Sequence, residues 1–466
     1  CITNRDRMFD CPQNLREEEM FEVPEWAANK VVYQIFPSRF AATEPVDKEL
    51  WYKAPITPMD DLHGNLRGII EHMDDIQNLG IDVLYMTPIF QSNSCHKYDT
   101  TDYYQIDPSF GTTEDLKELV QKAHERGMKV VLDAVYNHTG REFFAFADIL
   151  ENGEKSKYRD WYFIDGFPLK SEWGEIPNFK CFGYYGGMPK LNLKNPEVEK
   201  YITDVACYWI KECDIDGWRL DVGDEISHFF WKNFRKAVKA VKKDLLIIGE
   251  IWHYAGDFLE GDEWDTVMNY PFYLNLIDLL ADEKITVSQF VQNLGYLKGR
   301  LNKNCYPLMW NLIDSHDTAR FLHLCNDNKK KQHLAAAFQL LLPGMPMIYY
   351  GDEYAMPGAN DPDCRRGMYW DEEYQDKEMY EWYKRLIQVR KSHACIVEGE
   401  LAGIVTEDEE GTVVLIRKNG EETIAMIFNC SSSAKKFNEY TEKYNLLTEN
   451  TFDGKVEEFD AAVIVL

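Results

Sequence analysis

The sequence predicts an α/β protein built on a (β/α)₈ TIM barrel. Eight short β-branched or aromatic segments follow one another in strict alternation with amphipathic helical segments. Several of these strand segments end in charged side chains, as expected where a barrel carries its active site. At 466 residues the chain exceeds one ordinary hydrophobic core, so we expect smaller domains beside the barrel.

The strand segments are apolar runs that stop at proline, glycine or charged residues. The first covers 31–36 and stops at Pro37, and the second covers 83–86, shortly before Pro88. The other strands are predicted at 130–133, 217–222, 245–248, 266–269, 307–313 and 347–350.

The intervening segments repeat apolar residues at steps of three and four, which is typical of helices. Thr112 and Thr113 are candidate N-caps of one helix, Gly127 closes it, and Pro196 opens the next. The predicted helices cover 66–76, 112–127, 196–214, 227–243, 287–301, 330–342 and 378–393.

Two segments depart from the barrel pattern. The excursion at 138–195 is too long for an ordinary connection, which predicts an inserted subdomain. Residues 395–466 alternate with period two, which indicates a C-terminal antiparallel β-sandwich. We therefore assign an N-terminal arm to 1–25 and the barrel to 26–137 and 196–394.

Composition excludes several classes of protein. The formal net charge of −28 would repel nucleic acid and anionic membrane surfaces, and no apolar run is long enough to span a bilayer. The 11 cysteines are odd in number, scattered and mostly within apolar segments, which favours reduced thiols in the cytoplasm over a disulfide framework. We expect a cytoplasmic protein with no nucleic-acid or membrane partner.

Polar residues gather at the C-terminal ends of the predicted strands, where a barrel places its active site. No cysteine and histidine spacing suits zinc, and no glycine-rich phosphate loop is present. Several acids brought to one rim suit cleavage of a glycosidic bond, which needs a proton donor and a second carboxylate. The residues collected in this way are Asp133, Asn137, His138, Arg219, Asp221, Glu250, His316 and Asp317.

The spacing of these residues in the sequence suggests a separate chemical role for each. Arg219 precedes Asp221 by two residues, so both point to one side of the strand and the arginine can keep the carboxylate ionised. Glu250 is then the proton donor, with its pKa raised by neighbouring negative charge. Asp133 is either a participant in the chemistry or a purely structural partner of Arg219.

Four segments together resemble the motif regions of the α-amylase family of glycoside hydrolases. They are Asp-Ala-Val-Tyr-Asn-His at 133–138, Gly-Trp-Arg-Leu-Asp at 217–221, Gly-Glu-Ile-Trp-His at 249–253 and Ser-His-Asp at 315–317. A fifth, Met-Pro-Lys-Leu-Asn at 188–192, is similar to the marker of the neopullulanase, cyclomaltodextrinase and maltogenic amylase branch. The resemblance covers residues from about 21 to 466.

The resemblance implies a role for each matching residue. Asp221 corresponds to the nucleophile, Glu250 to the general acid and base, and Asp317 to the carboxylate that grips the sugar. The residues that it implies for substrate binding are Tyr98, His138, Arg219, Trp252, His253, His316, Asp361 and Arg365.

The resemblance also implies a reaction: retaining hydrolysis of α-1,4 and also α-1,6 glucosidic bonds in cyclodextrins and short maltooligosaccharides. A general α-amylase and an α-glucan transglycosylase are the alternatives, and a barrel that has lost catalysis is disfavoured because all three acids are present.

No cofactor is required and no metal ligand is predicted. A structural calcium ion is possible because Asn137 matches one family ligand, but it is not predicted, because Asp224 and Glu225 stand where secreted α-amylases carry a Lys-His pair. Homo-oligomer formation stays open too, since the branch's N-terminal β domain is absent from this sequence.

Overall fold

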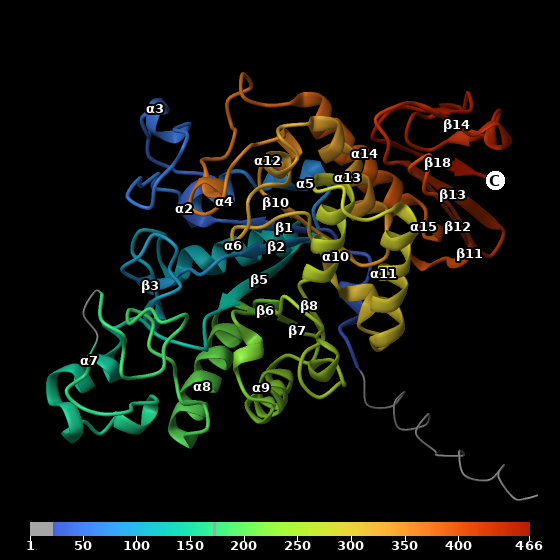
Figure 1. Ribbon diagram of the computed structural model, residues 1–466. Coiled ribbons are helices and arrows are strands. Elements are labelled where there is room, and N and C mark those ends of the chain that lie inside the picture. The colour runs from blue at the N-terminus through green and yellow to red at the C-terminus, as the bar shows by residue number, and fades with distance from the viewer. Residues whose placement is uncertain (1–21, 171–173) are drawn as a thin grey trace, which may run out of the picture.

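The computed structural model describes residues 22–170 and 174–466, and its largest unit is a barrel of eight parallel strands (Figure 1). Most of the predicted N-terminal arm, residues 1–21, lies outside the described residues. No helix in the described part of the chain is long and apolar enough to cross a bilayer.

The barrel strands pair in parallel in the order β8-β7-β6-β5-β2-β1-β10-β9. A parallel bridge between Met268, just after β8, and Trp310 in β9 joins the two ends of this order, which confirms the predicted barrel. The strands are β1 (Val32–Ile35), β2 (Val83–Met86), β5 (Lys129–Ala134), β6 (Gly217–Leu220), β7 (Leu246–Gly249), β8 (Thr266–Val267), β9 (Trp310–Asn311) and β10 (Met345–Tyr349).

Side chains from alternate strand positions fill the inside of the barrel. One buried cluster joins residues of β1, β2, β5, β7, β9 and β10 with Met268, which follows β8. It contains Val32, Val83, Tyr85, Val131, Leu246, Ile248, Met268, Trp310 and Met347. Since these side chains point inward, their chain neighbours point outward against the helices. The interior is therefore packed, and polar chemistry is confined to the strand ends.

Four strands are shorter than predicted, and two of them keep only two residues each. The segment 307–313 forms only β9, because Tyr306–Leu308 makes a 3-10 turn around Pro307. Likewise 266–269 forms only β8, because Asn269 leaves the strand to cap the next helix with its side chain on Phe272 N.

The helices surround the barrel, and their arrangement corrects the predicted alternation. Predicted helix 66–76 breaks at His72 into α4 and α5, and only a 3-10 turn, Gly256–Phe258, lies between β7 and β8. Helix α10 was not predicted. The main helices are α4 (Leu66–Glu71), α5 (Met73–Leu79), α6 (Thr113–Glu125), α8 (Pro196–Cys213), α9 (His228–Val241), α10 (Tyr270–Leu276), α11 (Val287–Arg300), α13 (Lys329–Leu341) and α14 (Lys377–Ser392).

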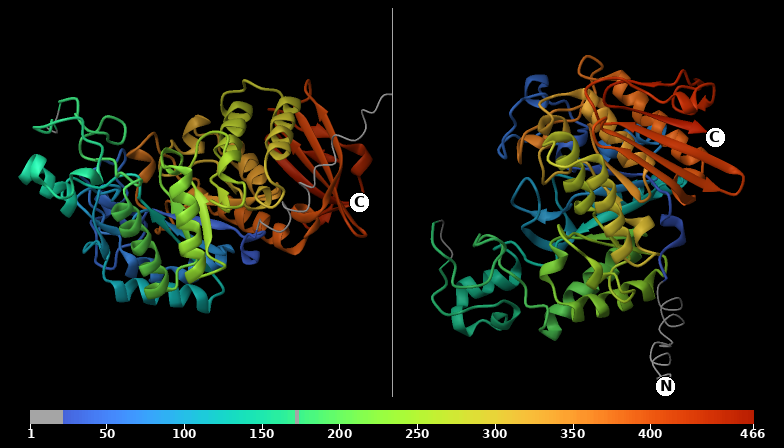
Figure 2. Two further views of the ribbon diagram at one scale, coloured as in Figure 1. Left: turned by 90° about the horizontal axis from the view of Figure 1, so that it is seen from below. Right: turned by 45° about the vertical axis from the view of Figure 1, so that its right-hand side comes forward.

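Two excursions rise from the barrel on its active-site side. One is an unpredicted hairpin of β3 (Phe90–Ser92) and β4 (Thr100–Ile106). The other is the predicted insertion, which carries α7 (Phe144–Asn152) and returns through antiparallel bridges such as His138 with Lys190. Figure 2 shows this insertion at the end of the molecule opposite the C-terminal sheet.

The C-terminal region forms a six-stranded antiparallel sheet in the order β11-β12-β13-β18-β15-β16, with a two-stranded ribbon of β14 and β17 beside it. One face packs against the barrel, where Phe428 stacks on Phe338 of α13 at 4.2 Å between ring centroids. The strands are β11 (Glu400–Glu407), β12 (Thr412–Asn419), β13 (Glu422–Asn429), β14 (Lys435–Lys436), β15 (Tyr444–Asn445), β16 (Asn450–Thr451), β17 (Lys455–Val456) and β18 (Asp460–Val465).

Gly249, the last residue of β7, holds the strand end close to a buried tryptophan. A Cβ at this position would lie 2.2 Å from Cε3 of Trp264. The Trp264 ring is fully buried and stacks on Phe258 at 4.1 Å, so it has little room to move. The absence of a side chain at 249 therefore lets the end of β7 pack directly against Trp264, and this contact positions the following residue, Glu250.

We predict that Gly249→Ala lowers the free energy of unfolding by about 1–3 kcal/mol, because the added methyl group overpacks this contact. The matched control is Gly295→Ala in α11, where a Cβ would meet nothing within 4 Å. This control should raise stability by about 0.5–1 kcal/mol, since glycine is unfavourable within a helix. Urea unfolding measures both, and equal stability of the two variants would contradict the close packing at Gly249.

Candidate active site

A buried arginine, Arg219 of β6, connects the acidic residues at the strand ends. Its Nη1 lies 3.0 Å from Oδ1 of Asp133 and 3.0 Å from Oδ1 of Asp221. Its Nη2 lies 2.9 Å from Oε2 of Glu250 and 4.0 Å from Oδ2 of Asp317. One guanidinium thus draws carboxylates from four strand ends of the barrel to one point.

Both carboxylate oxygens of Asp133, which lies beneath the site, have hydrogen-bond partners. Both of its oxygens accept hydrogen bonds from Arg219, and Oδ2 also accepts from the hydroxyls of Tyr85 at 2.7 Å and Tyr98 at 3.0 Å. Burial raises the pKa of Asp133 to about 6. This carboxyl has no free oxygen to offer a substrate, so the geometry favours its positioning of Arg219 and Tyr98 over a direct part in chemistry.

Asp221 offers one free oxygen. Its Oδ1 accepts a hydrogen bond from Arg219 at 3.0 Å, whereas Oδ2 is buried without a hydrogen-bond partner among the described residues. The next residue, Val222, has a φ of 46°, in the left-handed region that β-branched residues rarely occupy. This strained turn points the Val222 N–H toward Glu250, where it donates to Oε2 at 2.8 Å.

Glu250 follows β7 and is held on both oxygens. Oε2 accepts from Val222, and Oε1 accepts from the indole Nε1 of Trp252 at 3.2 Å. Trp252 in turn stacks on Tyr270, with 3.9 Å between ring centroids, and is 41% exposed. An exposed aromatic face therefore lies directly beside the carboxyl that could donate a proton.

The charges of the cluster do not balance. Four carboxyls, those of Asp133, Asp221, Glu250 and Asp317, surround one cation, Arg219. Burial raises the pKa of Asp221, and the charge of Glu250 raises it further. Burial and Asp317 likewise raise the pKa of Glu250, while Arg219 opposes both shifts. The carboxyls therefore titrate together, and the site retains a proton above the ordinary pH range of an isolated acid.

Asp317 forms part of a second group of residues across the site. Its Oδ1 lies 3.2 Å from Nε2 of His316 and 3.5 Å from Nη2 of Arg365. Arg365 also pairs with Asp361 at 2.8 Å and donates from Nε to the carbonyl of His316 at 2.8 Å. Burial lowers the pKa of His316, as does the charge of Arg365, so its imidazole is neutral.

Tyr98 and His138 form an aromatic wall. The Tyr98 ring lies parallel to that of His316, with 5.5 Å between centroids and 4° between planes. Nε2 of His138 donates to the carbonyl of Tyr98 at 3.0 Å, and burial lowers the pKa of His138 to about 4. His138 also stacks on Phe182 of the insertion at 5.4 Å.

These groups surround a cavity of about 410 Å³. Arg219 and His316 lie beneath it, and His253 lies outside it, 3.2 Å from Asp224. The predicted residues that line it are Tyr98, His138, Asp221, Glu250, Trp252, Asp317, Asp361 and Arg365.

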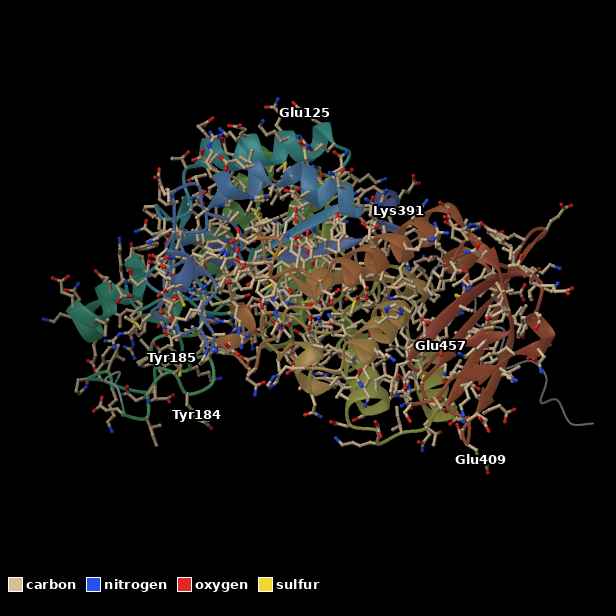
Figure 3. All side chains as sticks on the ribbon, turned by 90° about the horizontal axis from the view of Figure 1, so that it is seen from above. Glu125, Tyr184, Tyr185, Lys391, Glu409 and Glu457 are labelled. Atoms are coloured by element: carbon tan, nitrogen blue, oxygen red, sulfur yellow. The ribbon has the colours of Figure 1, made fainter. Side chains whose placement is uncertain are left out.

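Four further lining residues were not predicted: His96, Phe182, Met188 and Val222. The signal for Met188 was available, because it begins the marker segment 188–192. Tyr184 and Tyr185 of the insertion do not line the cavity. Figure 3 shows both at the outer tip of the insertion, and Tyr184 is 89% exposed.

Lys190 connects the insertion to the barrel. Its Nζ donates to Oδ1 of Asn137, to the carbonyl of Glu225 at 3.1 Å and to Oε2 of Glu225 at 2.9 Å. Asn137 and Glu225 are the positions at which the family resemblance raised the question of calcium. An ammonium group among three oxygens does not fit a cation ligand set. Within 22–170 and 174–466, no cluster of three His, Cys, Asp or Glu residues suits a metal ion.

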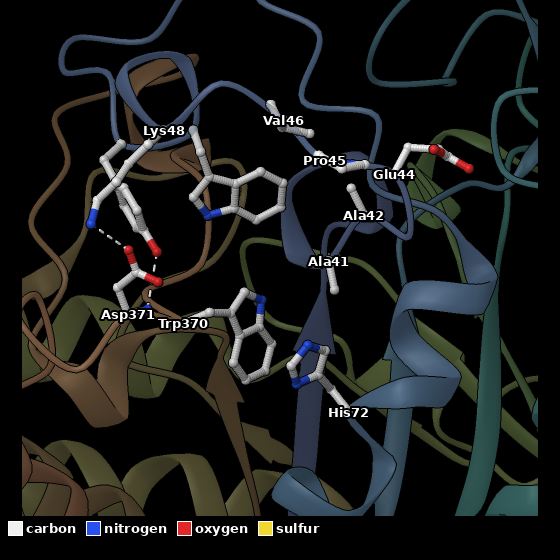
Figure 4. A pocket seen from close by; sticks show the side chains of 11 residues that line it. Ala41, Ala42, Glu44, Pro45, Val46, Lys48, His72, Trp370 and Asp371 are labelled. Carbon is white, nitrogen blue, oxygen red and sulfur yellow. Dashed lines mark hydrogen bonds and ion pairs between the residues drawn. The ribbon is translucent and has the colours of Figure 1, made fainter.

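A separate cavity of about 300 Å³ lies between the loop after β1 and the loop after β10 (Figure 4). Trp370 stacks on His72 at 3.6 Å, and Lys48 pairs with Asp371 at 2.7 Å. None of the predicted site residues lines it, so the paired carboxylates belong to the first cavity alone.

In this parallel barrel, Asp221 and Glu250 both contact Arg219, and Asp317 lines the same cavity. This arrangement defines the class of protein as a barrel glycoside hydrolase. The family model "Alpha amylase, catalytic domain" matches residues 34–399. The chain belongs to the α-amylase family.

Several similar proteins are cyclomaltodextrinases or neopullulanases. A cyclomaltodextrinase of Geobacillus thermopakistaniensis is 46% identical over 91% of this chain and 73% of its own. Neopullulanase 2 of Thermoactinomyces vulgaris is 42% identical over 89% of this chain and 72% of its own. A solved cyclomaltodextrinase structure superimposes with a TM-score of 0.90 at 38% identity, covering 95% of this chain and 79% of the other.

Proposed function

We propose that the protein is a retaining hydrolase of α-glucosidic bonds in cyclodextrins and short maltooligosaccharides, acting on α-1,4 and also on α-1,6 links. The observation that carries this proposal is the binding of Asp221 and Glu250 by the two arms of one guanidinium, at the wall of a cavity that also holds Asp317. The kinship with cyclomaltodextrinase and neopullulanase supports the substrate class.

In this proposal Asp221 is the nucleophile. Its free Oδ2 attacks the anomeric carbon while Arg219 holds Oδ1. Glu250 donates its proton to the glycosidic oxygen, and the leaving sugar departs across Trp252. Water then enters, Glu250 takes its proton, and the glycosyl-enzyme bond to Asp221 is cleaved.

The other residues bind and distort the reacting glucose. Asp317 accepts from its hydroxyls, and Tyr98 provides a flat apolar surface. The neutral imidazole of His138 holds Tyr98 in place by donating its one N–H to the Tyr98 carbonyl, and His316 supports Tyr98 and Asp317 from beneath. Asp361 and Arg365 contact the next sugar. His253 is assigned to the leaving-group side, held by Asp224.

Retention is supported by the shared arginine. A retaining pair of carboxyls lies about 5–5.5 Å apart, whereas an inverting pair lies about 6.5–9.5 Å apart to admit water. Two carboxyls that both contact one guanidinium, at 3.0 and 2.9 Å, suit the closer spacing. Transglycosylation is the second candidate, because the same intermediate also reacts with a sugar bound beside Asp224 and Glu225.

We predict that Glu250→Gln and Asp221→Asn differ in their activity on a substrate whose leaving group needs no protonation. Both variants should lose at least about 10²-fold in kcat on maltotriose, since each removes one of the two catalytic carboxyls. On α-maltosyl fluoride, Glu250→Gln should still release fluoride in a first-turnover burst, while Asp221→Asn should not. Stopped-flow fluoride detection measures this, and equal bursts from both variants would overturn the assigned roles.

We predict that β-cyclodextrin is opened faster than starch at equal enzyme and equal mass of substrate, with pullulan also cleaved. A product time course by chromatography measures the three rates, with the Asp221→Asn variant as the blank. Rapid starch breakdown with slow cyclodextrin opening would instead identify a general α-amylase.

We propose that the enzyme needs no calcium and that Lys190 takes the place of a structural cation. Chelator should leave activity and the melting temperature of the wild-type protein unchanged. Lys190→Asp should cost about 1–3 kcal/mol in chelator, because Asn137 and Glu225 lose their donor, and calcium should restore stability. Lys194→Ala is the exposed control and should change stability by less than about 0.5 kcal/mol. Loss of wild-type activity in chelator would refute this proposal.

We also propose a cytoplasmic location. The nine cysteines within the described residues are all free, and several are buried, which suits a reducing compartment.

A further inference from the structure

A third cavity, of about 370 Å³, is lined in part by Tyr254, which follows Trp252 by two residues. It is formed by the loop after β7, the first turn of α10 and the last two turns of α11. We call it the tyrosine cleft, and its lining residues are Tyr254, Pro271, Asn293, Tyr296, Leu297 and Arg300.

One loop of the chain contributes to both the tyrosine cleft and the catalytic cavity. Trp252 lines the catalytic cavity and stacks on Tyr270 at 3.9 Å. Tyr254 comes two residues after Trp252, and Pro271 comes directly after Tyr270, and both line the tyrosine cleft. The segment 252–254 therefore borders both cavities, with Trp252 on the catalytic side and Tyr254 on the side of the cleft.

The lining of the cleft has the chemistry of a sugar-binding surface. Tyr296 is 66% exposed and Tyr254 is 43% exposed, which is unusual for two large aromatic residues in one cavity. The Tyr254 hydroxyl donates to the carbonyl of Arg300 at 2.9 Å, so its ring is held in place. Aromatic rings present flat apolar faces to the C–H face of a pyranose. Asn293 and Arg300 supply polar groups for its hydroxyls.

We propose that the tyrosine cleft binds the glucosyl units of the substrate that lie two or more positions beyond the scissile bond on the leaving-group side. This inference rests on the proposed function and specifies how that site selects longer chains. The occupant follows from continuity, since a glucan that departs across Trp252 next meets Tyr254 and Tyr296. A maltotriose that places one sugar beyond the scissile bond does not reach the cleft.

The test uses Tyr296→Ala and Tyr254→Ala, with Tyr444→Ala as the control. Tyr444 is 47% exposed on the C-terminal sheet, and it is distant in sequence from the residues that line either cavity. We predict that each cleft variant loses about 5- to 10-fold in kcat/KM on maltohexaose and less than about 2-fold on maltotriose. Cleavage of maltohexaose labelled at its reducing end should move toward that end. The control should match the wild-type protein on both substrates.

A binding measurement separates failure of the cleft from failure of the proposed function. In the Asp221→Asn background, adding Tyr296→Ala should weaken maltohexaose binding about 5-fold by calorimetry, with maltotriose binding unchanged. An unchanged maltohexaose Kd, an equal loss on both substrates or an unchanged cleavage pattern would overturn the cleft. Absence of turnover by the wild-type protein would instead contradict the proposed function, because the binding comparison does not depend on catalysis.

Discussion

The buried guanidinium of Arg219 is the interaction on which the site depends. A charge without exposure to water is strongly unfavourable unless it is paired, and Arg219 is paired with acids from the neighbouring strands β5 and β7 and from its own. The same contacts place the two acids that the chemistry needs. Loss of either the barrel register or the arginine would therefore leave several carboxyls buried and uncompensated.

The barrel and most of the site were predictable because the determining patterns are local. Asp221, Glu250 and Asp317 each follow an apolar strand closely, and parallel strands bring their C-terminal ends to one rim. The two-residue spacing of Arg219 and Asp221 was enough to place both on one side of β6, as their 3.0 Å contact confirms. The C-terminal sheet was equally visible, because its strands alternate with period two.

Other features depend on contacts between distant segments. Phe182 reaches His138 only because the insertion folds back, and no spacing within 138–195 indicates this. Nothing local marks Val222 as left-handed either, since valine avoids that conformation. Helix α10 was missed because an Asn269 cap and Pro271 interrupt a strand-like run. Tertiary contacts thus decide the positions of Phe182 and Val222, whereas α10 has local start signals that the sequence interpretation missed.

Lys190 changes how the insertion is attached to the barrel. A metal ion at such a junction binds from solution, so the fraction of protein that carries it varies with the concentration of free ion. The ammonium of Lys190 is covalently part of the insertion and reaches Asn137 and Glu225 whenever the chain folds. Attachment then becomes an intramolecular event that does not depend on the concentration of a free ion. The wall of the catalytic cavity that the insertion supplies is consequently as permanent as the fold.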